Sequence, residues 1–560
     1  MKKITILLAL MLMPLMMMAQ SSAVKKAAKS MFKLTTFDAN GTLLNTGYGV
    51  FVDADGTCLA TWEAFIGAAK ANIIDAQGRK YDVDCLIGAN EIYNVSKFRV
   101  IVPDDKKMVI TPIAVAQAKI AEGGESWLAE YAIKAPILKK YQPSKVESFQ
   151  NDLPYYIYEE TAADELAGSP FLNANGELLG LMQPSKQRTD IYCPSAQYAM
   201  SMTVSGFTAK QATMRLTKMR IALPDTYDQA VVALFMNQGN NSSENILGMA
   251  EEFITKFPTN SEGYNIKAVQ YADKGQFAEA AQIMATSIEK CEKKDEAHFD
   301  YSKLILNKLL YSNDSTYTDW TFEKSIEEVD AAYAINPQPI YTLHKAKVLY
   351  AAQKYDEAYN TFMDVTKTNM RSAECFYNAF LCLQAKNESK EKCIELLDSA
   401  VACFSQPFTQ EAAQYLMIRG KYLEENGMYR KAAFDFGEYE KLMGQYMNAK
   451  FYYLKEQTEL KAKIYDKALE DIDKAITLAP NEELYLAEKA MLQIRVNMLD
   501  EGMETAQQCM TRFPELGDGY AVYGLAQILK GKKKDGLATL EKAKELGSEM
   551  AAPIIEKYGK

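Results

Sequence analysis

Only two histidines occur in the chain, His298 and His344, and both lie in sequence with helical periodicity. A Ser-His-Asp triad needs an imidazole beside the serine to accept and return its proton. Nine cysteines are present without a Cys-x-x-Cys pair or a Cys/His cluster, so the sequence predicts no metal site and no cofactor. Five of them lie in helical sequence, where a small, buried, apolar role is expected: Cys291, Cys375, Cys382, Cys393 and Cys403.

Residues 31–203 have the pattern of a β-domain, with short apolar or alternating runs between turns rich in Gly, Asp and Asn. Residues 47–52 and 57–60 flank an Asp-Ala-Asp-Gly turn and predict a β-hairpin. Similar strand pairs are expected over 71–88 and 170–181. This spacing of short strands predicts an all-β barrel or sandwich.

The order of these hairpins resembles the HtrA-type branch of the trypsin-like serine proteases over about 170 residues. The matching segments are the first hairpin (47–56), the histidine segment (58–64), the aspartate strand (94–100), the serine loop (166–173) and the final strand (191–194). The resemblance implies a trypsin-like double barrel over 24–205. It also places Glu63, Asn94 and Ala167 at the three positions of the catalytic triad. We therefore expect a protease fold that is not an enzyme and has no catalytic residue.

The alternative is an active serine-type hydrolase with a rearranged site around Glu63 or Ser169. Ser169 lies two positions past the nucleophile position, and Glu63 follows Trp62. A carboxylate with an ordinary pKa of about 4 is a poor proton acceptor for a serine. Residues 165–167 also lack the glycine of the family's oxyanion turn.

Peptide binding without cleavage is a further expectation for this half. In the family, the strand after the serine loop pairs with an extended substrate peptide, so Ile191, Tyr192 and Cys193 are the predicted binding residues. The same strand could instead complete the barrel. The tyrosines of 153–158 could form a binding wall or pack between strands.

The first residues predict export. Lys2 and Lys3 precede an apolar run over 4–18 that is too short to span a bilayer, and the small residues Ala19, Ser21 and Ser22 follow. We expect a signal peptide over 1–19 without a lipid-anchor cysteine, and a periplasmic or secreted protein with no membrane span. Loss of the two lysines changes the formal charge from −10 to −12. This acidity disfavours nucleic acid and acidic membranes as partners.

The second half has helical periodicity and an internal repeat. A small residue recurs after similar turn sequences, at intervals of 45, 33, 35, 39, 36, 34 and 34 residues: Ala280, Ser325, Ala358, Cys393, Ala432, Ala468, Gly502 and Gly536. Apolar or small residues follow four and seven positions later in several copies, and a proline follows at twelve. This spacing predicts helix pairs, with a further pair over 225–258.

This region resembles tetratricopeptide repeats, with about eight to nine copies over 225–550. The resemblance implies an all-α superhelix whose groove binds a peptide or protein. We expect the two halves to fold independently, joined by a connecting segment over 206–224 with a helix over 207–221. The expected function is that of an exported, non-catalytic protein-binding or scaffold protein.

Overall fold

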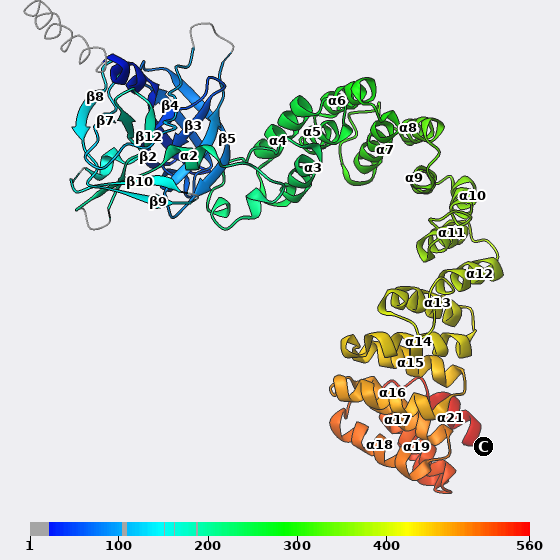
Figure 1. Cartoon of the computed structure of the whole chain (residues 1–560). Helices are drawn as coiled ribbons and strands as arrows, with labels where there is room; N and C mark the ends of the chain where they lie inside the picture. The colour runs from blue at the N-terminus through cyan, green and yellow to red at the C-terminus, as the bar shows by residue number, and fades with distance from the viewer. Residues whose placement is uncertain (1–21, 104–108, 151, 162, 186–188, 560) are drawn as a thin grey trace, which may run out of the picture. The chain divides into compact units, whose positions relative to one another are not determined.

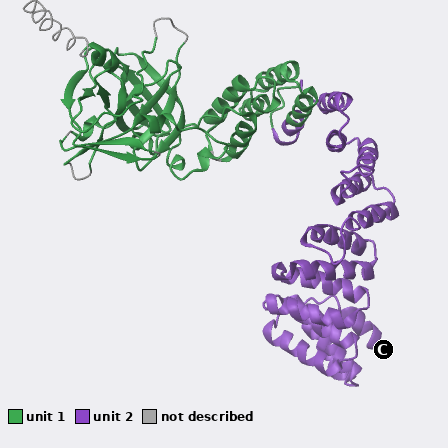
Figure 2. Cartoon of the chain, viewed as in Figure 1, with its two compact units in different colours: residues 1–304, 313–318 green, residues 305–312, 319–560 purple. Residues whose placement is uncertain are grey.

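A computed structural model describes residues 22–103, 109–150, 152–161, 163–185 and 189–559. The predicted signal peptide lies outside these residues. The chain divides into two compact units, residues 1–304 with 313–318 and residues 305–312 with 319–560 (Figure 2). The first unit contains the β-domain and the first helices, and the second contains helices only (Figure 1).

Six strands at the start of the β-domain form a closed antiparallel barrel in the order β1-β2-β3-β6-β5-β4. The strands are β1 (Met31–Phe37), β2 (Leu43–Phe51), β3 (Thr57–Ala60), β4 (Lys70–Asp75), β5 (Lys80–Asn90) and β6 (Val95–Val100). The predicted first hairpin is confirmed, because β2 pairs with β3 across its turn. Gly56 in that turn has φ +93°, a conformation that glycine adopts without steric cost.

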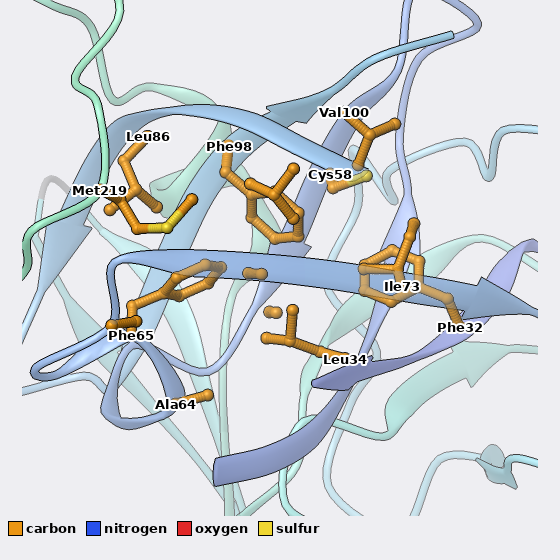
Figure 3. Close-up of a cluster of buried hydrophobic side chains, with 14 of the residues drawn as sticks. Phe32, Leu34, Cys58, Ala64, Phe65, Ile73, Leu86, Phe98, Val100 and Met219 are labelled. Carbon is orange, nitrogen blue, oxygen red and sulfur yellow. The ribbon is translucent and has the colours of Figure 1, made fainter. Parts of the chain in front are cut away.

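Aromatic and branched side chains fill this barrel (Figure 3). The rings of Phe32 and Phe65 pack edge-on against Phe98, with centroid separations of 6.0 and 5.1 Å. Edge-to-face contact is the favoured geometry for aromatic pairs and adds to the effect of burial. Met219 reaches the same core from the segment that follows the β-domain.

The remaining strands form two four-stranded sheets, in the orders β12-β11-β7-β8 and β13-β14-β10-β9. They are β7 (Ser126–Glu130), β8 (Ile137–Tyr141), β9 (Lys145–Phe149), β10 (Leu153–Tyr158), β11 (Pro170–Asn173), β12 (Leu178–Leu181), β13 (Gln183–Pro184) and β14 (Ile191–Pro194). Both sheets contribute to one core, in which the rings of Tyr158 and Phe171 stack at 4.4 Å.

The expected second closed barrel is therefore not present among the described strands. β8 and β9 each pair on one side only, and β12 is linked to the end of β14 by an isolated bridge between Gly180 and Ser195, the residue that follows β14. The glycine allows this approach, because a Cβ there would lie 2.1 Å from the carbonyl oxygen of Pro194.

The joining helix predicted over 207–221 is wrong. The segment has two short 3₁₀ turns, Thr208–Lys210 and Met214–Leu216, and then runs extended along the barrel. The amide of Leu86 donates to the carbonyl of Arg220, and the amide of Ala222 donates to the carbonyl of Leu86. These bonds to β5 replace the bonds that a helix would make within itself.

A run of α-helices follows this segment. In the first unit they are α3 (Tyr227–Met236), α4 (Ser243–Lys256), α5 (Ser261–Asp273) and α6 (Phe277–Lys290). α7 (Lys294–Tyr311) begins in the first unit and ends in the second. The second unit continues with α8 (Phe322–Ile335), α9 (Pro339–Ala351), α10 (Tyr355–Val365), α11 (Ala373–Ala385), α12 (Lys390–Val401), α13 (Ala413–Glu425), α14 (Tyr429–Met443), α15 (Ala449–Lys461), α16 (Tyr465–Leu478), α17 (Glu483–Arg495), α18 (Leu499–Arg512), α19 (Gly517–Leu529), α20 (Lys533–Glu545) and α21 (Ala551–Tyr558). Within the described residues, no helix combines the length and apolar character needed to cross a bilayer.

The small residues of the predicted repeat occupy the same position in their helices. Each of the eight predicted small residues is the fourth residue of its helix and is buried, in α6, α8, α10, α12, α14, α16, α18 and α20. Ile246 occupies the same position in α4, 34 residues before Ala280. Close packing explains the small size. A Cβ on Gly536 would lie 2.5 Å from Cγ1 of Ile528 in the preceding helix.

Candidate functional site

Two of the predicted triad positions lie side by side at the rim of the first barrel. Glu63 begins a 3₁₀ turn after β3, and Asn94 lies between β5 and β6 with φ +43°. The backbone N–H of Glu63 donates to Oδ1 of Asn94 at 2.8 Å. The backbone N–H of Trp62 donates to the Asn94 carbonyl at 3.3 Å. Asn94 therefore holds the turn that carries Glu63, and the Glu63 side chain is exposed.

The third predicted position is brought close to the same rim. Ala167 follows a 3₁₀ turn over Asp164–Leu166, and Gly168 follows it with φ +87°. A Cβ on Gly168 would lie 2.3 Å from the carbonyl oxygen of Tyr48 on β2 and 3.2 Å from Cγ2 of Thr61. Glycine is needed here for both the backbone conformation and the close approach. The serine loop thus lies against the barrel beside the segment that carries Glu63.

The backbone donors of the serine loop are all engaged. The N–H of Ala167 donates to the carbonyl of Asp164 at 3.0 Å. The N–H groups of Gly168 and Ser169 donate to the carbonyls of Met182 and Leu166, at 2.9 and 3.0 Å. An oxyanion hole needs N–H groups that point at the developing charge and have no other acceptor. The loop supplies no such donor from residues 167–169.

Ser169, the alternative nucleophile, is fully buried at 0% exposure. Its Oγ has no hydrogen-bond partner among the described residues, so no base contacts it there. The two histidines lie on α7 and α9, outside the β-domain. Nucleophilic attack by a serine needs a base to accept its proton and access for the substrate. The described residues around Ser169 provide neither.

The predicted peptide-binding strand is β14, and it has neighbours on both sides. β10 pairs with all four of its residues, and β13 pairs with Ile191 and Tyr192. Ile191 and Cys193 are 0% exposed and point into the core between the sheets. Addition of a peptide at Ile191 and Tyr192 would therefore require β13, which has only two residues, to leave. Binding by these residues stays a prediction.

The tyrosines of β10 divide between the two faces of their sheet. Tyr156 and Tyr158 are buried in the core, whereas Tyr155 lies in a half-buried aromatic cluster on the other face. Ring contacts of 4.7 to 6.4 Å join the members of this cluster, Tyr93, Phe149, Tyr155, Tyr192 and Tyr198. Burial, followed by repulsion from neighbouring ionisable groups, raises the pKa of Tyr155 to about 12. Sequence reasoning missed the cluster because its five members come from five separate elements and loops between residues 93 and 198.

The cysteines and the helical aromatics serve packing. All nine cysteines are free, and all except Cys403 are buried. Burial raises the pKa of the Cys193 thiol well above its ordinary value, which keeps it as an unreactive thiol. On the helices, the aromatic rings of Phe376 and Phe451 are buried, at 4% and 8% exposure.

No family model matches this chain, and no curated protein matches it. Among solved structures, it is similar to the HtrA-type protease AlgW with tripeptide and to a variant of AlgW with tripeptide. The identity is 16% in both cases, and the TM-scores are 0.28 and 0.27. The match covers 32% of this chain and 61% of each AlgW chain, so the chain spans about three fifths of those structures.

Proposed function

We propose that this chain is an exported, non-catalytic protein-binding or scaffold protein, with a degenerate trypsin-like domain and a tetratricopeptide-repeat solenoid. The observation that carries the proposal is the engaged serine loop. Ala167 stands at the nucleophile position, and its N–H is bonded within its own turn. Both the nucleophile and the oxyanion donor of an acyl-transfer enzyme are therefore lacking at that position.

The helical half supports the binding role. Helix pairs at intervals of mostly 33–36 residues, with small residues at a constant position in the helix, are typical of tetratricopeptide repeats. Repeats of this kind stack on their neighbours and present a continuous groove to a peptide or protein partner. The solenoid is the larger candidate surface. In the β-domain, the candidate strand β14 already has neighbours on both of its edges. Export is proposed from the sequence of the first 19 residues alone.

The non-catalytic part is tested with a serine-directed fluorophosphonate on the purified full chain, beside trypsin as a positive control. We expect no labelling, because Ser169 is 0% exposed and has no base. Ser169→Ala is the matched variant. Labelling of the parent chain that disappears in this variant would show that the rearranged hydrolase is correct.

The binding part is tested by capture from an envelope extract, with the full chain, residues 22–258 and residues 259–560 as separate baits, so that the ion pair of Arg220 with Glu252 stays within one bait. The solenoid bait should retain the partners of the full chain. Because the chain is acidic, raising the salt concentration should slow association more than it speeds release. Capture by the β-domain bait alone would place the binding site in the barrel and make the repeats a spacer.

A further inference from the structure

A cluster of ionisable side chains is buried between helices α14 to α17, where nothing in the proposed function requires it. Glu456 and Glu459 on α15 and Asp471 on α16 are 0%, 1% and 1% exposed. Lys455, also on α15, is 6% exposed. Glu440 of α14 completes the group. Three carboxylates are thus almost fully removed from water, where an unpaired charge is costly.

The two lysines of the cluster are already matched by two carboxylates. Nζ of Lys455 lies 2.6 Å from Glu440 and 2.7 Å from Asp471. Nζ of Lys474 lies 2.8 Å from Glu440 and 2.9 Å from Asp471. Glu440 and Asp471 therefore each form ion pairs with both Lys455 and Lys474. This four-membered arrangement has no net charge, and it leaves Glu456 and Glu459 without a cation of their own.

The carboxyl groups of Glu456 and Glu459 have few contacts that would stabilise a negative charge. Glu459 Oε1 is 3.7 Å from Lys455, beyond hydrogen-bond distance, and its Oε2 has no hydrogen-bond partner among the described residues. Glu456 accepts one hydrogen bond, from Gln457 at 2.9 Å, and its Oε1 has no partner in the described chain. A buried oxygen that receives no hydrogen bond is better satisfied when the carboxyl holds a proton.

The other charged groups that face these carboxyls do not change this conclusion. On α17, Glu488 repels the Glu456 charge and Arg495 attracts it. On α16, Asp471 repels the charges of both carboxyls. Lys455 on α15 and Lys467 on α16 attract the Glu459 charge. Burial is the largest effect at both sites, and it raises the pKa of Glu456 to about 7 and that of Glu459 to about 8.

We propose that Glu456 and Glu459 make the α15–α17 segment a pH-responsive element, which is held together by two buried carboxyl protons and loosens as the pH rises. In the unfolded chain both carboxyls lose their protons near pH 4.5, whereas in the folded helices they retain them up to about pH 7 and 8. Between these limits the folded state binds more protons than the open state, so rising pH favours opening. Each retained proton changes the opening equilibrium by up to tenfold per pH unit.

The test is hydrogen exchange with mass spectrometry on the full chain from pH 5 to 8.5, expressed as protection factors relative to the intrinsic exchange rate at each pH. We expect protection of α15–α17 to fall by up to tenfold per pH unit for each proton, relative to α11 and α12 in the same molecule. An unchanged ratio between the two regions from pH 5 to 8 would overturn the proposal in the unmodified protein.

Two variants assign the effect to these side chains. Glu459→Gln keeps the shape of the side chain and removes its titration, so the pH dependence of α15–α17 should become shallower by the contribution of one proton. Glu470→Gln, on the exposed face of α16, is the matched control and should keep the full slope. If Glu459→Gln loosens the helices at every pH, Glu456→Gln provides the same comparison. A variant slope equal to that of the parent would contradict the assignment.

Discussion

The β-domain and the first helix pair are joined by a group of charged side chains, and its removal is the sharpest test of the fold. Arg220, from the segment after the β-domain, forms ion pairs with Asp84 of β5 and with Glu252 of α4. Arg99 of β6 lies 3.0 Å from Asp84 and 3.1 Å from Glu252. Lys256 approaches Glu252 at 3.4 Å. The Arg220 and Glu252 side chains are each only 7% exposed.

Arg220→Met is expected to destabilise this unit by about 3 kcal/mol. Removing one partner of a buried ion pair costs about 3–5 kcal/mol, because the other charge stays buried. The lower end applies here, since Arg99 and Lys256 still contact Glu252. Methionine keeps much of the apolar stem that packs on Gly248, where a Cβ would lie 3.0 Å from Cδ of Arg220.

The assay is urea unfolding followed by the fluorescence of Trp62 and Trp127, in a Trp320→Phe background that leaves the tryptophans of the β-domain alone. With an m-value of about 3 kcal/mol/M, the midpoint should fall by about 1 M. Limited proteolysis should also cut the variant more readily than the parent chain within residues 217–224, which are buried in the parent except for Lys218.

The matched control is Lys70→Met. Lys70 of the barrel pairs with Glu244 of α4 at 3.3 Å, but the two side chains are 62% and 76% exposed. An exposed pair of this kind contributes about 0–1 kcal/mol. A midpoint shift in Arg220→Met no larger than that in Lys70→Met would refute the argument that the buried charges hold these elements together.

Three further changes test the site and the packing. The triple variant Glu63→His, Asn94→Asp, Ala167→Ser should keep casein hydrolysis within about tenfold of background. The N–H at position 167 is already hydrogen-bonded, and loss of one oxyanion donor costs about 2.7–4 kcal/mol. Robust turnover would show that the loop can open to free this N–H. Gly168→Ala should lower the midpoint of thermal unfolding by several degrees in calorimetry. Gly168 has φ +87°, and an added Cβ would lie 2.3 Å from the carbonyl oxygen of Tyr48 on β2. An unchanged midpoint would show that the loop shifts freely. Gly437→Ala, in open space on α14, should instead stabilise the helix by about 0.5–1 kcal/mol in urea unfolding, and a loss of stability would mean that the added methyl group meets an obstacle.

The sequence determined the parts of this protein that depend on local periodicity. The first hairpin, the change from strands to helices and the register of the repeat all follow from the spacing of apolar, small and turn residues. The small residue at the fourth position of eight helices is a clear case, because each repeat must meet the same packing requirement against its own partner helix. The sequence also located both histidines in helical segments, and the structure places them on α7 and α9, outside the β-domain.

Tertiary structure alone decided the contacts between distant segments. The prediction of a helix over 207–221 failed because Leu86 of β5 offers backbone partners that no local pattern reveals. The second barrel was expected from a resemblance, whereas closure depends on strand pairing that the sequence does not fix. Whether Ser169 is accessible, and whether Glu459 has a cation of its own, depends on which side chains surround them after folding. Burial and charge balance are properties of the packed neighbourhood, so composition and spacing could not supply them.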